Sequence, residues 1–219
     1  MLNLNLATII SRVIVLITAF TIHEFAHAWT ANYFGDSTPK INGRLTLNPL
    51  AHLDPIGSLM LLVAGFGWAK PVPVNPYTLR QRAPSALMWV SLAGPFSNFL
   101  MAVLAAIPFQ LSLLTREDLF ASFAVQKAIL PTPAGFLFDF ITINLVLGLF
   151  NIIPLPPLDG DKIADFFMPE SWREVTARIR PYGPMILIAL FIVGPYFGID
   201  LLGWILNKPL YFLMNLLLG

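Results

Sequence analysis

The 219-residue sequence contains no cysteine, which excludes disulfides, thiolate catalysis and cysteine metal ligands together. Charged residues are also scarce, at 11% of the chain, about half the fraction found in a typical soluble domain. The net charge of +1 gives no basic stripe for nucleic acid, so no nucleic-acid partner is expected. Apolar residues are in excess, at 57%, and must face something other than water. A lipid bilayer is the obvious candidate.

The apolar segments predict an all-α polytopic membrane protein, with a core of three transmembrane helices and one or two additional C-terminal spans. No polar linker divides the chain, so residues 1–219 are expected to form one membrane-embedded domain. A helix needs about 20 residues to cross a bilayer. The predicted spans are about 4–31, 84–114, 132–156, 182–198 and 199–218, of which the last two form either two spans or a broken hairpin.

The region from about 41 to 80 is different, because glycine and proline interrupt it and it contains the β-prone pieces "RLTL" and "KPVPVNP". Its apolar stretch "PIGSLMLLVAGFGW", residues 55–68, is short for a span. We therefore predict a re-entrant or β-hairpin region there, packed against protein. The polar stretch 158–181 predicts a short amphipathic helix.

Basic residues predict the orientation of the chain in the membrane. They concentrate in the regions 32–83 and 158–181 and are sparse in the loop 115–131. The two rich regions are separated by two predicted spans, so they lie on the same side, which the positive-inside rule assigns to the cytoplasm. The N-terminus is then outside.

The stretch "TIHEFAHAWT", residues 21–30, places His23, Glu24 and His27 near the inner end of the first span. Two histidines four apart share one helix face and can occupy adjacent corners of a tetrahedral zinc site. Glu24 beside them can act as general base, as in the H-E-x-x-H pattern. The alternative is a pair of polar residues hydrogen-bonded at a helix end, but ionisable residues are costly within a span.

Zinc needs a third protein ligand. The extended metzincin pattern requires glycine and histidine where the chain has Thr30 and Tyr33, so that class is excluded. The candidate glutamates all lie in polar loops, and they are Glu117, Glu170 and Glu174. The better candidate is Asp159 in "NIIPLPPLDGDKI", where three prolines predict unwound backbone and Gly160 permits a tight turn. The alternative is an ordinary Asp-Gly turn.

These motifs resemble those of the site-2 proteases, which are intramembrane zinc metalloproteases. "HEFAH" and "NIIPLPPLDG" match in order, "AGPFSN" at 93–98 resembles the family's intervening span, and "NPLAHLDPIG" at 48–57 resembles its compact bacterial and archaeal members. The resemblance covers roughly residues 15–165. We therefore expect a compact form, without a PDZ insertion and without a nucleotide-sensing domain after the last span.

The resemblance implies one Zn²⁺ per chain, held by His23, His27 and Asp159, with Glu24 as base. It also implies that Asn151 lies at the active site and steadies the substrate or the tetrahedral intermediate. The expected substrates are single-span membrane proteins, such as anti-sigma factors, membrane-held transcription factors or remnant signal peptides. The implied reaction is regulated intramembrane proteolysis in the cell (cytoplasmic) membrane, with the active site toward the cytoplasm.

Three further polar residues carry open alternatives. Asn98 either bonds the metal-ligand network or bridges helices. His52 is a further metal contact, a hydrogen-bond donor to a metal ligand, a substrate-gating residue or simply a hydrogen-bonded loop histidine. Asp139, a lone carboxyl near the outer end of the third span, has no assigned role.

Two rival functions fit part of the pattern. A metal-binding membrane transporter would use intramembrane histidine and aspartate, but transporters usually show repeated halves and this chain shows none. A catalytically inactive homologue that only binds helices would have no use for the base Glu24.

Overall fold

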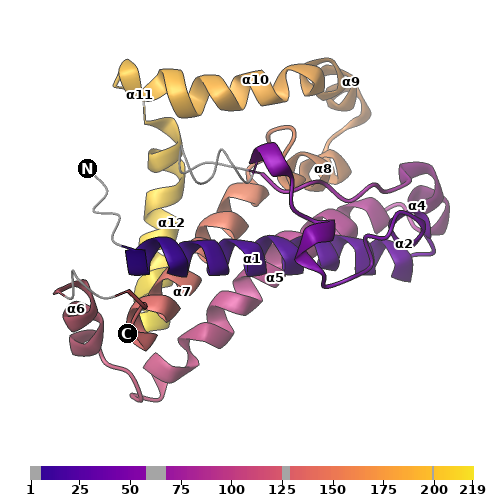
Figure 1. Cartoon of the computed structure of the whole chain (residues 1–219). Helices are drawn as coiled ribbons and strands as arrows, with labels where there is room; N and C mark the ends of the chain where they lie inside the picture. Colours follow the sequence, from indigo (N-terminus) through magenta and orange to yellow (C-terminus); the bar gives the residue numbers. More distant parts are fainter. Residues whose placement is uncertain (1–5, 58–67, 125–128, 199) are drawn as a thin grey trace.

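The computed structural model describes residues 6–57, 68–124, 129–198 and 200–219 (Figure 1). Within these ranges the fold is helical and contains no strand, which confirms the all-α class. The four longest helices are α1 (Leu6–Tyr33), α5 (Ala86–Gln110), α7 (Pro133–Ile152) and α12 (Leu201–Leu218).

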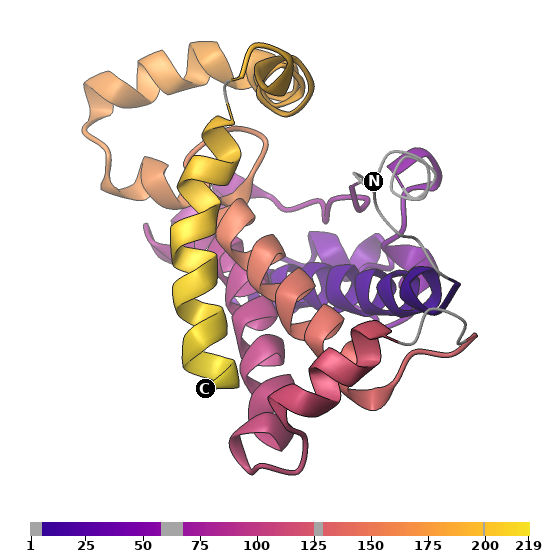
Figure 2. The ribbon, with the colours of Figure 1, turned by 90° about the vertical axis from the view of Figure 1, so that its left-hand side faces the viewer.

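Three of these helices, α1, α5 and α7, are long and apolar enough to cross a membrane. Helix α5 packs against both α1 and α7, so it is the centre of the bundle (Figure 2). Small buried residues such as Ala28 and Ala102 line the packed faces and let the backbones approach closely. Large side chains such as Ile14 and Leu104 are exposed on the outer faces, as expected of lipid-facing positions. The chain is therefore a membrane protein with the predicted three-helix core.

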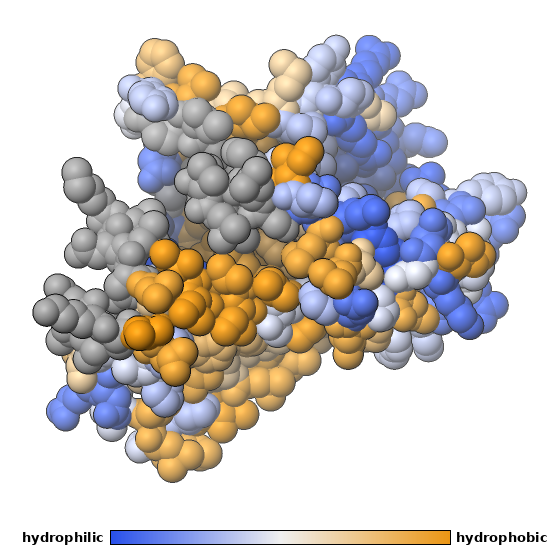
Figure 3. Space-filling model, in the orientation of Figure 1, coloured by the Kyte–Doolittle hydropathy of each residue, from blue (hydrophilic) through white to orange (hydrophobic). Residues whose placement is uncertain are grey.

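Short helices gather at the end of the bundle where α1 finishes and α5 begins. They are α2 (Thr38–Ile41), η1 (Pro49–Ala51), α4 (Pro76–Arg82), α8 (Asp159–Phe167) and α9 (Glu170–Ile179). Arg80 of α4 lies 4.0 Å from Asp165 of α8, so the two basic regions of the sequence meet at this end. Polar residues cover the α2 and α4 end, whereas apolar residues cover the opposite end of α1 and α5 (Figure 3).

The predicted region 41–80 forms no hairpin in its described part. Its one ladder contact is an isolated antiparallel bridge between Leu53 and Ala69, and "RLTL" is irregular. Lys70 N–H donates to the His52 carbonyl at 2.8 Å beside that bridge. Most of the apolar stretch expected to be re-entrant falls at 58–67, outside the described residues.

The C-terminal part continues as η2 (Arg180–Tyr182), α10 (Gly183–Ile188), the π-helical turn η3 (Ala189–Val193) and α11 (Gly194–Tyr196). This run lies crosswise to α12 in both ribbon views (Figures 1 and 2). The bend between them includes Gly198 at φ +72°, a conformation that favours glycine. Helix α12 returns along α7 and α5. The predicted spans 182–198 and 199–218 thus form two helical segments that run in different directions.

Asp139, for which the sequence suggested no role, pairs with α1. Its Oδ1 lies 3.9 Å from Arg12 Nε, which joins α7 to α1 away from the polar end. A carboxylate and a guanidinium within a bilayer lower each other's cost, so this pair accounts for both charges.

Candidate metal centre

His23 and His27 project from the same face of α1 and are both buried, at 6% and 8% exposed. His27 Nδ1–H donates to the Val90 carbonyl of α5 at 2.7 Å. His23 Nδ1–H donates to Asn98 Oδ1, also on α5, at 2.6 Å. Each Nδ1 therefore carries the ring proton, which leaves each Nε2 lone pair available as a metal ligand.

Asp159 completes the group from a different segment. The prolines of "PLPP" end α7 and unwind the chain as predicted, but Asp159 itself is the first residue of helix α8 rather than part of the unwound backbone. Gly160 is also helical. A Cβ on it would lie 2.2 Å from the Ile152 carbonyl oxygen, so glycine is needed for the close approach of α8 to the end of α7, not for a turn. The tight turn that was expected directly after Asp159 is therefore not formed.

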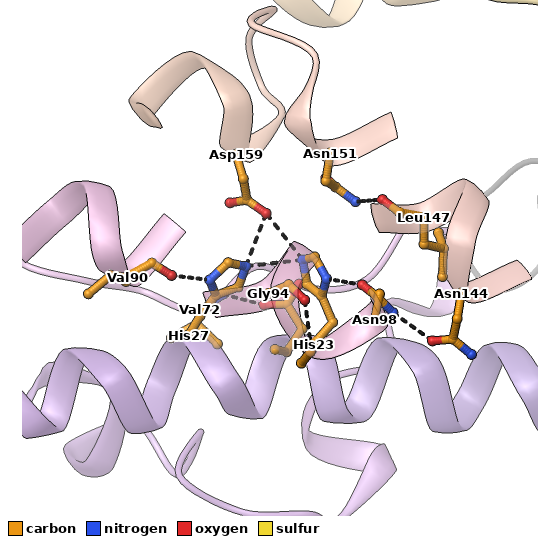
Figure 4. Close-up of polar contacts among 12 residues, drawn as sticks. His23, His27, Val72, Val90, Gly94, Asn98, Asn144, Leu147, Asn151 and Asp159 are labelled. Carbon is orange, nitrogen blue, oxygen red and sulfur yellow. Dashed lines mark hydrogen bonds and ion pairs between the residues drawn. The ribbon is translucent and has the colours of Figure 1, made fainter. Parts of the chain in front are cut away.

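The three ligand atoms form a closed triangle (Figure 4). Asp159 Oδ2 lies 3.2 Å from His23 Nε2 and 3.1 Å from His27 Nε2, and the two Nε2 atoms are 3.0 Å apart. Zinc bonds of about 2.0–2.2 Å in a tetrahedron place neighbouring ligand atoms about 3.3–3.6 Å apart, close to these separations. Two neutral imidazoles and one carboxylate are the donor set of a catalytic zinc site. The residues therefore fit zinc.

Gly94 of α5 forms the floor of the site. A Cβ added there would lie 2.4 Å from His27 Nε2 and 2.6 Å from His23 Nε2. The missing side chain leaves the space between the two nitrogens open. This is the glycine of the "AGPF" motif, and its role follows from that close approach.

Asn98 performs both functions that the sequence left open. While Oδ1 accepts from His23, its Nδ2 donates to Asn144 Oδ1 of α7 at 2.8 Å, and Asn144 Nδ2 donates to the Phe140 carbonyl at 2.9 Å. Asn98 and Asn144 are both 0% exposed. The chain of hydrogen bonds orients His23 and also joins the three core helices. Sequence reasoning missed Asn144, although a second asparagine within a predicted span was a visible signal.

Glu24 is buried beside the histidines on α1, at 8% exposed. Its Oε2 accepts a hydrogen bond from the Val72 N–H at 3.0 Å. Val72 belongs to the "KPVPVNP" piece, so this segment lies against the candidate base. Nothing in the composition of that piece indicated such a contact.

The other candidate residues are not part of the triangle. Asn151 lies on the last turn of α7 near Asp159, and its Nδ2 donates to the Leu147 carbonyl at 3.0 Å (Figure 4). His52 is fully buried and its Nε2–H donates to the Thr46 carbonyl at 2.8 Å, the arrangement of a loop histidine. Among the described residues, His23, His27 and Asp159 form the only group able to hold a metal ion, so the candidate glutamates of the polar loops do not join it.

Ion pairs anchor helix α8 behind Asp159. Arg180 Nε lies 2.8 Å from Asp161 Oδ2, and Arg180 Nη2 lies 3.0 Å from Asp165 Oδ1. Burial lowers the pKa of Arg180, but the two aspartates outweigh burial and raise it above its ordinary value. Burial likewise raises the pKa of Asp159, but His27 and His23 outweigh it and hold that pKa well below its ordinary range. Asp159 is therefore ionised and ready to bind a cation.

Comparison with known proteins gives the class. The chain is 42% identical over 186 residues to the "Putative zinc metalloprotease YwhC" of Bacillus subtilis. The matched residues cover 84% of this chain and 82% of that relative. It is 36% identical over 180 residues to the "Putative zinc metalloprotease Rip2" of Mycolicibacterium smegmatis, covering 78% of this chain and 62% of that relative. The Rip2 of Mycobacterium tuberculosis (strain H37Rv) is 30% identical over 191 residues, covering 84% and 68%. No family model and no solved structure matches the chain.

A buried His-His-Asp centre between membrane-length helices and these relatives together define a membrane-embedded zinc metalloprotease. The chain belongs to the site-2 protease family. Its cofactor is zinc, for which the triangle provides the ligands. This membership favours an enzyme over the transporter and the inactive homologue that the sequence left open.

Proposed function

We propose that the protein is an intramembrane endopeptidase that cleaves the transmembrane segments of single-span membrane proteins. The observation that carries the proposal is the position of the triangle, buried where α1, α5 and the α7–α8 junction meet, within a bundle of three apolar helices. A peptide bond that reaches this site must come from a segment that is itself in the membrane or enters it.

Each residue around the triangle can supply one part of the reaction. Zinc, when bound, polarises a carbonyl and acidifies water. Glu24 takes a proton from the attacking water and delivers it to the leaving amine. Asn98 and the Val90 carbonyl keep the two imidazoles oriented. Asn151, near Asp159, can turn its amide from Leu147 to the substrate carbonyl oxygen.

Substrate must be unwound before it is cleaved, because the amides of a helix are protected by its own hydrogen bonds. The site lies near the polar end of the bundle, so water reaches it from that side. We place this end in the cytoplasm, on the strength of the basic residues concentrated there. Anti-sigma factors, membrane-held transcription factors and remnant signal peptides are the proposed substrate classes, and regulated intramembrane proteolysis is the proposed setting.

The test is cleavage of a tagged single-span substrate by purified protein in detergent or vesicles. Wild-type protein should cleave it, and mass spectrometry should place the cut within the apolar segment. A zinc chelator and the substitution Glu24→Gln should each lower the rate by about 100-fold or more, the contribution expected of a general base. Glu117→Gln, the same chemical change at an exposed residue of α6 (Arg116–Ala124), is the matched control. Unchanged cleavage by Glu24→Gln, or cuts only outside the apolar segment, would refute the proposal.

A further inference from the structure

The segment from Lys70 to Asn75 runs against α1 and directs its backbone amides inward. Lys70 N–H donates to the His52 carbonyl at 2.8 Å, and Val72 N–H donates to Glu24 Oε2 at 3.0 Å. Asn75 N–H donates to Asp36 Oδ2 at 2.6 Å. Two of these three acceptors are carboxylates, one on α1 and one just after it.

Between Lys70 and Asn75, the Val72 amide is the only one with a hydrogen-bond partner among the described residues. Pro71 and Pro73 have no N–H, and the described residues include no hydrogen-bond acceptor for the amide of Val74. Both prolines also restrict their neighbours to extended backbone. The alternation therefore leaves one amide donor between Lys70 and Val74 that has a partner, and that partner is Glu24.

The anchor at Asn75 fixes where this donor points. Asp36 is 1% exposed, and its second oxygen, Oδ1, accepts from Thr38 N–H at 2.9 Å. Asp36 thus ties the end of the segment to the residues that follow α1. The Val72 amide is held between this anchor and the Lys70 bond to His52, so its position relative to Glu24 is set by backbone rather than by a mobile side chain.

We propose that the backbone amide of Val72 is a positioning group for Glu24, an inference that rests on the proposed role of Glu24 as base. A carboxylate can rotate and present either oxygen. A charge-assisted bond to Oε2 stops this rotation and leaves Oε1 to receive the proton. The segment "KPVPVN" thereby aligns the base without touching the metal ligands.

The first test measures the contact itself by hydrogen–deuterium exchange at single-residue resolution. In the wild-type protein the amides of Val72 and Asn75 should exchange slowly. In Glu24→Ala the Val72 amide should exchange at least about tenfold faster while the Asn75 amide stays protected, because only one acceptor has been removed. Glu24→Gln, which keeps an acceptor oxygen, should preserve more of the protection at Val72. Equal acceleration at both amides, or none at Val72, would overturn the inference.

The second test measures the consequence. Val72→Pro removes the N–H in a segment already restricted to extended backbone, and Val74→Pro removes an N–H that has no acceptor among the described residues. Val72→Pro should lower kcat about 10- to 100-fold, the loss typical of a group that orients a catalytic residue, with KM and bound zinc unchanged. Val74→Pro should keep kcat within about threefold of the wild-type value, because it leaves the contact to Glu24 intact. Equal loss of kcat in both variants, or a loss confined to KM, would contradict the positioning role.

The two hypotheses fail in different ways. If Glu24→Gln cleaves as well as the wild type, the base is elsewhere and the proposed function fails in its mechanism, whatever the exchange data show. If Glu24→Gln is inactive while Val72→Pro is fully active, only the positioning role fails.

Discussion

His23 and His27 are held by acceptors of different kinds. The acceptor for His27 is the carbonyl of Val90, which no side-chain substitution removes, and the acceptor for His23 is the side chain of Asn98. The orientation of His23 is therefore the more sensitive to mutation. The same asparagine donates to Asn144, so its loss also leaves a buried group on α7 without a partner.

Substituting Asn98 in two ways should separate these two functions. Asn98→Leu removes both bonds and should weaken zinc binding about 10- to 100-fold and lower stability by about 1–3 kcal/mol. Asn98→Asp keeps an acceptor for His23 and loses only the donor to Asn144, so it should retain more zinc affinity. Zinc titration and thermal unfolding measure the two effects. Equal zinc affinity in both variants would show that the bond to His23 is unimportant.

Gly94→Ala should abolish the metal site with little effect on helix α5. The added Cβ would lie within 2.4–2.6 Å of both Nε2 atoms, so the imidazoles must move apart, whereas alanine is itself a good helix former. Bound zinc after dialysis should fall by at least about tenfold, with the helical circular dichroism unchanged. Gly148→Ala of α7 is the control, because the atoms nearest to its added Cβ all belong to the Phe99 ring, at 3.0–3.1 Å, and not to a metal ligand. Zinc retained at the wild-type level in Gly94→Ala would contradict the geometry.

The ligands could be predicted from sequence because their spacing is local or their motif is rare. His23 and His27 satisfy a helical repeat, and Asp159 follows a run of prolines that few spans contain. Asn144 was a visible signal that was missed, but the roles of Gly94 and the Val72 amide could not be predicted, because each acts through a contact between segments that are far apart in the chain. A backbone N–H, in addition, leaves no residue-type signal at all.

Helix α8 shows how an element carries a ligand to its place. Asp159 is at its first turn, Gly160 packs on the end of α7, and two aspartates further along pair with Arg180. The helix is therefore held at two places, at Gly160 and at the two aspartates, both of which follow the ligand in the chain. Its orientation, and with it the third corner of the triangle, depends on a residue that follows α9.

Arg180→Gln should loosen this arrangement. Asp161 and Asp165, both buried, would lose their shared cation, at a cost of about 1–3 kcal/mol since Arg180 itself is only partly buried. Thermal unfolding measures the loss, and zinc affinity should fall with it because Asp159 is on the same helix. Arg178→Gln, an exposed arginine of α9, is the control. No difference between the two variants would show that the ion pairs do not hold α8.

Helices α1, α5 and α7 begin and end near the limits of the predicted spans, where apolar runs meet polar residues or proline. The β-prone pieces of the region 41–80 were poorer guides, since β-propensity depends on a partner strand and the described residues offer a single bridge. Helix α6 lies in the predicted loop 115–131, and helix α8 lies in the stretch 158–181, where one short amphipathic helix was predicted and α9 also forms. Both are short, and packing against neighbours rather than propensity stabilises them.

The whole molecule is asymmetric along its length, with polar short helices at one end and an apolar surface over α1 and α5 toward the other (Figure 3). The metal centre lies toward the polar end, and the Arg12–Asp139 pair lies away from it. This asymmetry agrees with the basic-residue pattern and gives the orientation a direct test.

The absence of cysteine makes single-cysteine labelling informative. Lys40→Cys and Arg178→Cys, both exposed at the polar end, should react with an impermeant maleimide only after the inner side is opened. Glu117→Cys, exposed on α6, should react from the outside in intact cells. Each variant should still cleave substrate, which controls for folding. Labelling of Lys40→Cys and Glu117→Cys from the same side would refute the proposed topology.

His23 and Asp159 are 136 residues apart in the chain, and the triangle brings them together. An ion bound by both is a cross-link as well as a reagent, because it closes a loop that contains α5 and α7. Closing so long a loop restricts the unfolded chain considerably. Chelation should therefore lower the melting temperature along with the activity, because the apo-protein lacks both the cross-link and the reactive metal ion.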